Sequence, residues 1–405
     1  MNLDFNRLMG DATRLTQGGD LQGATELIQR ALLGKQDTGA SSDAPQDRRW
    51  PEDAAAHIAG RKVSPNARDM VLDVESRVVS AGAEPLAADP VSSPRTATET
   101  TEPKSEPAAA EPERFVDGSF SHQGRALAYK LFVPARRAGS NESPRGLVVM
   151  LHGCTQNAAD FAAGTRMNEL AAAHDLLVLY PEQAQRANPQ RCWNWFKPQH
   201  QKRGRGEPAV LAAMTRSIAE AHRVDPARVY IAGLSAGGAM ADIMGRAYPD
   251  LFAAVGVHSG LPAGAAKDVV SALSVMRSGP QGSSSSSPAA GSGPLPPTIV
   301  FHGDADATVH PSNGTAVAGA ARGHEDRSAA SPPQVTDGRS PRGQSYTRTT
   351  YGESTGQAAV EHWRLHGAGH AWAGGSASGS YTDARGVDAS AEMLRFFLAH
   401  PRRGA

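Results

Sequence analysis

The sequence predicts an α/β fold in which helices cover both faces of a mostly parallel sheet. Short apolar runs recur between residues 146 and 365, and Gly or Pro closely follows each run. Patterns with helical spacing separate the runs. Nearly continuous apolar runs are typical of parallel strands that are buried on both faces. The runs are Gly146–Met150, Leu176–Tyr180, Arg228–Ala232, Ala253–Val257, Thr298–Phe301 and Val360–Leu365.

This regular pattern lies within residues 114–400, which we expect to form one folded domain. Residues 1–34 show helical periodicity around a Gly-Gly break, and they predict a helical hairpin. Residues 35–113 are rich in Ala, Pro, Ser, Glu and Thr, and they predict a disordered linker. Two polar stretches, near 279–297 and 323–346, interrupt the domain, and we expect both to be low-complexity insertions.

Composition argues against several classes of partner. The chain has 41 basic and 41 acidic residues, so it lacks the net positive charge that is typical of nucleic-acid-binding proteins. No stretch of about 18 apolar residues occurs, and we therefore expect no membrane span. The first residues lack the basic start and apolar core of a secretory signal, which favours a cytoplasmic location.

The residues G-L-S-A-G at 233–237 carry the strongest chemical signal. Gly is common in this chain, so the pattern alone is weak. Its context is specific, because a strand at 229–232 precedes it and a helical run at 238–248 follows it. That is the nucleophile elbow of the α/β-hydrolase fold, in which a sharp turn presents the serine above the sheet. Ser235 is therefore the expected nucleophile.

A serine nucleophile needs a histidine base and an acid that orients this base. In this fold the three residues occur along the chain in the order Ser, acid, His. Asp304 and Asp306 follow the strand that ends near Phe301, and we favour Asp306 as the acid. His370 follows the last strand on a Gly-flanked loop and is the expected base. The histidines that compete with it are His302, His310, His362 and His366.

Ester hydrolysis also needs two N–H donors for the negative charge that develops on the carbonyl oxygen. The backbone N–H of Ala236, directly after the nucleophile, is the first expected donor. The N–H of Cys154, in the loop after the first parallel strand, is the second. The alternative is that this loop is only a tight turn.

Two further groups of residues lie at expected strand ends. Trp193, Trp195 and Trp372 either line a substrate cleft or pack in the core, and we favour the cleft. Cys154 and Cys192, the two cysteines of the chain, either form one disulfide that ties two strand-end loops together or remain reduced. Ser259 lacks the flanking pattern of an elbow, so we expect it to be a loop residue near the site.

Taken together, these motifs resemble the polyhydroxybutyrate (PHB) depolymerase family of esterases, to which feruloyl and acetylxylan esterases are related. The resemblance covers residues 115–400 and implies a catalytic domain of α/β-hydrolase fold. It places the triad at Ser235, Asp306 and His370. One departure is Ala373, where members often have Pro. The motifs are L-H-G-C-T-Q at 151–156, Y-P-E-Q at 180–183, C-W-N-W at 192–195, G-L-S-A-G-G at 233–238, H-G-x-x-D at 302–306 and G-H-A-W at 369–372.

The resemblance implies a serine esterase that needs no metal and no organic cofactor. Its expected partner is an ester substrate, either a poly(3-hydroxyalkanoate) polymer or its oligomers. A carbohydrate esterase that removes feruloyl or acetyl groups is the alternative with the same chemistry. A non-catalytic protein that binds polymer granules through residues 1–34 is an alternative of another class. Because the family includes secreted enzymes, an extracellular location is the alternative to the cytoplasm.

Overall fold

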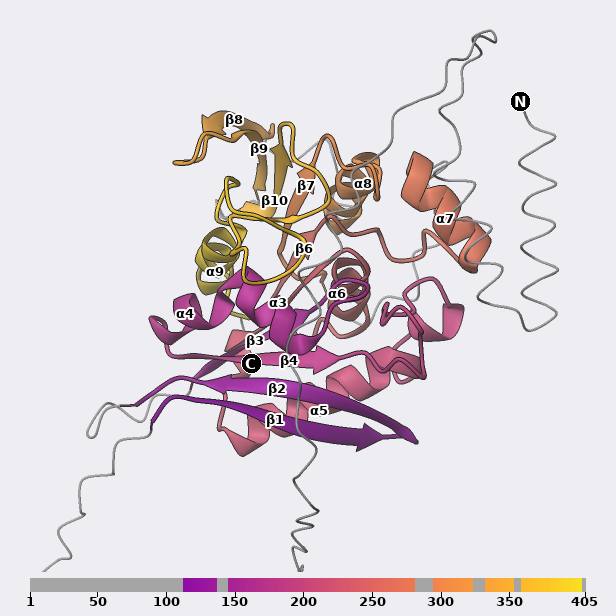
Figure 1. Cartoon of the computed structure of the whole chain (residues 1–405), viewed down its shortest axis with the longest axis vertical. Coiled ribbons are helices and arrows are strands. Elements are labelled where there is room, and N and C mark those ends of the chain that lie inside the picture. The colour runs from indigo at the N-terminus through magenta and orange to yellow at the C-terminus, as the bar shows by residue number, and fades with distance from the viewer. Residues whose placement is uncertain (1–111, 137–144, 281–293, 323–331, 353–357, 403–405) are drawn as a thin grey trace, which may run out of the picture. The chain divides into compact units, whose positions relative to one another are not determined.

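The computed structural model describes five segments of the chain, which are residues 112–136, 145–280, 294–322, 332–352 and 358–402. The expected hairpin at 1–34, almost all of the expected linker at 35–113, and residues 281–293 of the first insertion lie outside them. The described residues contain one large sheet of ten strands in the order β1-β2-β4-β3-β5-β6-β7-β10-β9-β8 (Figure 1).

The six strands from β4 to β10 in this order are parallel, and each matches one of the six apolar runs. The mostly parallel sheet that the sequence predicts is therefore confirmed. The strands are β1 (Arg114–His122), β2 (Arg125–Val133), β3 (Gly146–Leu151), β4 (Leu176–Glu182), β5 (Val229–Leu234), β6 (Ala254–His258), β7 (Thr298–Gly303), β8 (Gln334–Arg339), β9 (Ser345–Gly352) and β10 (Ala358–Leu365). A small separate pair consists of β11 (Trp372–Ala373) and β12 (Thr382–Asp383).

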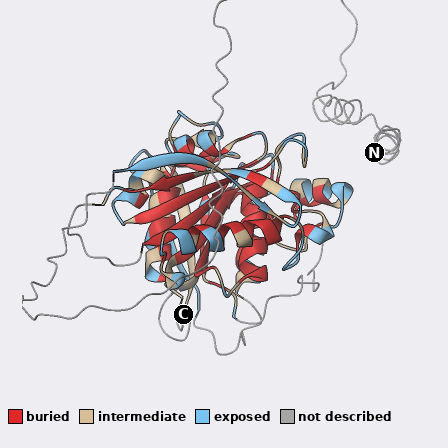
Figure 2. Cartoon of the chain, turned by 90° about the horizontal axis from the view of Figure 1, so that it is seen from below, coloured by how far each residue is buried: buried red, intermediate tan, exposed pale blue. Residues whose placement is uncertain are grey.

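Helices cover both faces of this sheet, because successive side chains of each strand point to opposite faces. In β3, Val148 and Met150 belong to the core cluster that contains residues of α3, α4 and α9, whereas Leu147 and Val149 belong to the cluster that contains residues of α5, α6 and α8. Figure 2 shows the strands between the helical layers as buried. The helices are α3 (Ala158–Thr165), α4 (Met167–Ala172), α5 (Gly206–Ala221), α6 (Ala236–Ala247), α7 (Val269–Ser278), α8 (Ser312–Ala321) and α9 (Ala389–Ala399).

The two edges of the sheet are antiparallel hairpins that the sequence analysis did not predict. Strands β1 and β2 form one of them, and β8 and β9 form the other. Strand β8 lies inside 323–346, so the expectation of a low-complexity insertion is wrong for the part from 334 onward. The pattern there is polar because β8 is an edge strand and most of its residues are exposed.

The carboxyl ends of the central strands meet along one edge of the sheet. Leu234 at the end of β5 pairs with His258 of β6, and His258 pairs with Phe301 of β7. Gly303 at the end of β7 pairs with Leu365 at the end of β10. Loops that leave these strands therefore start side by side, which is where open α/β sheets bind their ligands. No helix among the described residues is both long and apolar enough to cross a bilayer.

Candidate active site

Ser235 lies on the sharp turn between β5 and α6. Its backbone angles, φ 57° and ψ −120°, are unfavourable for a residue with a side chain. The turn is possible because its neighbours are glycines: a Cβ on Gly237 would lie 2.1 Å from the carbonyl oxygen of Leu151. The Ser235 N–H donates to the carbonyl oxygen of His258 at 2.9 Å, which holds the turn against β6. These contacts form the strand–turn–helix elbow that the sequence predicts.

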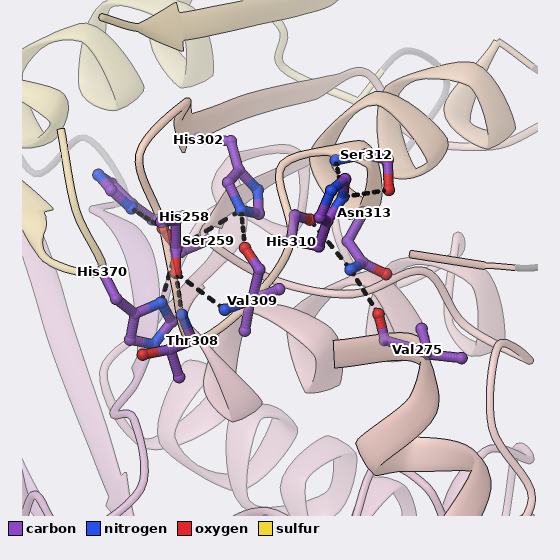
Figure 3. Close-up of polar contacts among 11 residues, drawn as sticks. His258, Ser259, Val275, His302, Thr308, Val309, His310, Ser312, Asn313 and His370 are labelled. Carbon is purple, nitrogen blue, oxygen red and sulfur yellow. Dashed lines mark hydrogen bonds and ion pairs between the residues drawn. The ribbon is translucent and has the colours of Figure 1, made fainter. Parts of the chain in front are cut away.

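His370 and Asp306 form a direct pair. The Nδ1 of His370 lies 2.7 Å from Oδ2 of Asp306, whose side chain is fully buried. The other oxygen, Oδ1, accepts from the backbone N–H groups of Thr308 at 2.9 Å and Val309 at 2.8 Å (Figure 3). An ionised carboxylate only accepts, so Nδ1 of His370 carries the proton and Nε2 remains an acceptor.

Two opposing effects act on Asp306. Its burial favours the neutral acid, but the hydrogen bonds from His370 and the Val309 N–H, together with the charge that His370 and His302 carry when protonated, favour the carboxylate. The second group of effects is larger, and the pKa of Asp306 lies below its ordinary value. The carboxylate is therefore available to orient His370 over the whole neutral pH range.

Asp304, the alternative acid, has another partner. Its Oδ2 lies 2.8 Å from Nδ1 of His366, and its Oδ1 accepts from the N–H of Gly367 at 2.7 Å. The second ring nitrogen of His366 lies 2.9 Å from the Thr347 hydroxyl. Both nitrogens of His366 are thus engaged away from Ser235, and this pair ties β10 to the loop after β7.

The two expected oxyanion donors follow the carboxyl ends of β3 and β5, which are neighbouring parallel strands. Ala236 is the first residue of α6, where the N–H groups have no partner within the helix. In the preceding loop the N–H of Gly153 is bound by Oε1 of Gln156 at 2.9 Å. Among the hydrogen bonds of the described residues, neither Cys154 N–H nor Ala236 N–H donates to a protein group. Neither amide is therefore committed to a protein acceptor in the described part of the chain.

Cys154 and Cys192 form a disulfide. The bridge joins the loop after β3 to the C-W-N-W segment after β4, as one of the two alternatives for these cysteines expected. Glu207, a buried residue in α5, supports the second loop: it accepts from Asn194 N–H at 2.8 Å and from the Gln183 side chain at 2.6 Å. Burial opposes ionisation of Glu207, but its hydrogen bonds to His200, Asn194 and Gln183 outweigh burial, and its pKa is lowered.

His258 is a further residue of the site that sequence reasoning missed. Its side chain is fully buried, and its Nε2 accepts from the N–H of Ala373 at 3.0 Å. Burial, together with the nearby His302 and His370, lowers the pKa of His258 to about 3, so the ring is neutral at pH 7. Through its carbonyl and its ring, His258 connects the Ser235 turn to the loop that follows His370.

The three tryptophans expected at a cleft are buried. Trp193 and Trp195 belong to the core on the α5 side of the sheet, and Trp372 belongs to the core on the α9 side. Trp193 donates to the carbonyl oxygen of His152 at 3.1 Å, and Trp372 donates to the Ser390 hydroxyl at 3.0 Å. The expectation that they line the cleft surface is therefore wrong, because all three side chains are buried.

The fold is that of the α/β-hydrolases, and Ser235, Asp306 and His370 follow the carboxyl ends of β5, β7 and β10. Residues 127–322 match the family model described as "Esterase PHB depolymerase".

Individual esterases and depolymerases are also similar to part of this chain. Poly(3-hydroxyalkanoate) depolymerase C of Paucimonas lemoignei is 38% identical over 178 residues, which are 41% of this chain and 42% of that protein. Probable acetylxylan esterase A of Aspergillus clavatus is 29% identical over 196 residues, which are 45% of this chain and 61% of that protein. The solved acetyl xylan esterase from Aspergillus awamori has the same fold, with a TM-score of 0.54 at 20% identity over 70% of this chain and 99% of that chain. The chain thus matches less than two thirds of the length of each of these two curated relatives.

Proposed function

We propose that this chain is a serine esterase that hydrolyses carboxylic esters through an acyl-Ser235 intermediate. The single observation that carries the proposal is the His370–Asp306 hydrogen bond of 2.7 Å at the sheet edge where the Ser235 elbow also lies. This pairing leaves Nε2 of His370 as the basic atom of the site. The available N–H groups of Cys154 and Ala236 supply the electrostatic part of the chemistry.

The reaction proceeds in two acyl transfers. In the first, Nε2 of His370 takes the proton of the Ser235 hydroxyl while the oxygen attacks the ester carbonyl carbon. The resulting oxyanion is held by the two N–H groups. When the intermediate collapses, the C–O bond to the alcohol breaks, the alcohol leaves with the proton from His370, and the acyl group stays on Ser235. Water then repeats the sequence and releases the acid.

The proposed substrates are poly(3-hydroxyalkanoate) chains or their oligomers. This choice follows the family match and the 38% identity to a protein named poly(3-hydroxyalkanoate) depolymerase. Acylated polysaccharide is the alternative, because other relatives are named acetylxylan esterases. Both substrates present a carboxylic ester to the same nucleophile, so the difference must come from the residues around the site.

A substrate panel tests the proposal. Wild type and Ser235→Ala are compared on a short-chain nitrophenyl ester, a 3-hydroxybutyrate oligomer, a PHB film and acetylated xylan, and Ser235 is labelled with a fluorophosphonate. We expect labelling of wild type alone, and faster hydrolysis of the oligomer or film than of xylan. Faster release of acetate from xylan would make the chain a carbohydrate esterase. Binding to PHB without labelling or hydrolysis would overturn the enzymatic proposal.

The Cys154–Cys192 disulfide also bears on the compartment. Disulfides form and persist mainly in oxidising surroundings and are rare in the cytosol. The bridge therefore supports the extracellular location over the cytoplasmic one that the N-terminal residues favour. Mass spectrometry of the protein from its native host, alkylated before any reduction, distinguishes the two: unmodified, bridged cysteines support the oxidising location, and two alkylated cysteines contradict it.

A further inference from the structure

Gln156 belongs to the loop between β3 and α3, which also carries the expected oxyanion donor Cys154. Its side chain is buried, with 2% of its surface exposed. Its Oε1 accepts the N–H of Gly153 at 2.9 Å. This bond fixes the peptide that precedes Gly153, and so it fixes the start of the next peptide, whose N–H belongs to Cys154. Within the described residues, Gln156 forms no hydrogen bond with Ser235 or with His370.

The orientation of the Gln156 amide is determined by its partners. Its Nε2 donates to Oδ2 of Asp160 at 2.9 Å and to the backbone carbonyl oxygen of Ser380 at 3.1 Å. Turning the amide over would place its oxygen against these two acceptors and its NH₂ group against the N–H of Gly153. Only one orientation satisfies all the groups, and a buried polar group is costly when it is not satisfied.

Asp160 completes the network by binding the segment after the catalytic histidine. Its Oδ1 accepts from Ser380 N–H at 2.8 Å, and its Oδ2 accepts from the Ser380 hydroxyl at 2.6 Å. The next residue, Tyr381, accepts the N–H of Trp372 at 2.7 Å through its carbonyl oxygen, and its hydroxyl lies 3.1 Å from the Thr155 hydroxyl. Trp372 is two residues beyond His370. The network thus connects the oxyanion loop to the loop of the base.

Backbone strain is present at both ends of this connection. Thr155 has φ 65° and Tyr381 has φ 51°, and both values are uncommon for residues with a side chain. Such conformations persist only where surrounding contacts hold them. The hydrogen bonds of Gln156, Asp160 and Ser380 are the contacts that surround these two positions.

We propose that Gln156, held by Asp160 and Ser380, is a positioning residue that keeps the Cys154 N–H directed at the developing oxyanion. The inference rests on the proposed esterase function and adds residues to it that do not touch the substrate. An N–H donor acts in the transition state, where the charge is largest, more than in the ground state. Loss of its alignment therefore lowers kcat and leaves KM nearly unchanged.

The test compares three variants with wild type on a soluble short-chain ester. Gln156→Leu has nearly the same shape and cannot bond to Gly153, and we expect kcat to fall about 10- to 100-fold, less than the loss of a whole oxyanion donor. Asp160→Asn places an NH₂ group against either the Gln156 amide or the Ser380 N–H, and we expect a smaller fall in kcat. Ser380→Ala removes the hydroxyl that donates to Asp160 but keeps the backbone N–H and carbonyl of Ser380, and we expect the smallest fall in kcat of the three.

A second readout separates positioning from general loss of structure. The affinity of a boronic acid, which forms a charged tetrahedral adduct with Ser235, should fall by the same factor as kcat/KM in Gln156→Leu, while the affinity for the carboxylic acid product stays within about threefold. The proposal is overturned if Gln156→Leu keeps kcat within twofold. It is also overturned if kcat falls while boronate affinity does not, because the effect is then structural. A wild type that neither hydrolyses esters nor reacts with a fluorophosphonate contradicts the proposed function instead.

Discussion

Asp306 and His370, 64 positions apart in the chain, meet through a 2.7 Å contact between Oδ2 and Nδ1. The carboxylate is held on its other oxygen by two backbone N–H groups, so it can rotate little. Asp304 and His366 form a second Asp–His pair, in which Oδ2 of the aspartate lies 2.8 Å from Nδ1 of the histidine. Its histidine is bound on both nitrogens, so one edge of the sheet carries a pair suited to catalysis and a pair suited to structure.

Replacement of each aspartate by Asn separates these roles. In Asp306→Asn the amide can no longer stabilise the imidazolium that forms at His370, and its NH₂ group favours the wrong tautomer of the ring. We expect kcat to fall about 10³- to 10⁴-fold. Asp304→Asn is the matched control, with an expected change within about threefold. Steady-state kinetics on a soluble ester measure both, and a larger loss in Asp304→Asn would assign the acid to Asp304.

The elbow glycines provide a second prediction. In Gly237→Ala the new Cβ would lie 2.1 Å from the Leu151 oxygen and 2.6 Å from the His152 oxygen, and neither backbone atom can move away easily. We expect the free energy of unfolding to fall by about 1–3 kcal/mol or more. A shift of the turn by about 1 Å should also reduce kcat/KM about 100-fold.

Gly319→Ala is the control for this prediction. Gly319 lies in α8, where a Cβ meets no atom within 4 Å. Because Gly weakens a helix relative to Ala, we expect a gain of roughly 0.5–1 kcal/mol and unchanged kinetics. Urea unfolding measures both variants. Equal stability changes in the two would show that the close approach at Gly237 does not matter.

The disulfide gives a third prediction. Cys154 and Cys192 are 38 positions apart, and their bridge restricts the unfolded chain. The double variant Cys154→Ser/Cys192→Ser should lose about 2–4 kcal/mol of unfolding free energy. Its kcat should also fall by a larger factor than its KM changes, because the Cys154 N–H belongs to the bridged loop. Urea unfolding and steady-state kinetics test this, with oxidised wild type as the reference; a variant equal to wild type in both contradicts the prediction.

The central sheet and the elbow turn were predictable from the sequence for a physical reason. Parallel strands buried on both faces are apolar throughout, so β3 and β5 stand out as continuous runs. The elbow is also local, because its glycines and Ser235 are neighbours in the chain. Local sequence could not decide between Asp304 and Asp306, because the choice depends on which histidine each carboxylate meets across the sheet edge.

Other features depend on contacts between distant segments, and no local sequence pattern predicts them. Polar residues such as Gln156 and His258 are buried because Ser380 and Ala373, more than 100 positions away in each case, supply their partners. The sequence predicted a cleft lined by tryptophans for the same reason, since only the packed structure shows that Trp193 is buried. The edge strand β8 was missed because its exposed polar residues resemble a loop in sequence.

His258 provides a prediction about pH. The pKa of this buried histidine is lowered from 6.5 to about 3 in the folded protein, chiefly by burial. Between these two values the unfolded chain binds a proton at this position and the folded protein does not. Protons therefore favour unfolding, and the stability due to neutral His258 is present above pH 6.5 and is lost as the pH falls toward 3.

In His258→Phe the ring keeps its stacking with Phe301 and Trp372 but cannot titrate. The N–H of Ala373 loses its acceptor, so we expect the unfolding free energy at pH 7 to fall by about 1–3 kcal/mol. Between pH 6.5 and 4 the stability of the variant should then decline less steeply than that of wild type. Urea unfolding at a series of pH values measures both slopes, and His174→Gln, which changes an exposed side chain, controls for the loss of a histidine as such. Parallel slopes for wild type and His258→Phe would mean that His258 takes up no extra proton on unfolding in this range.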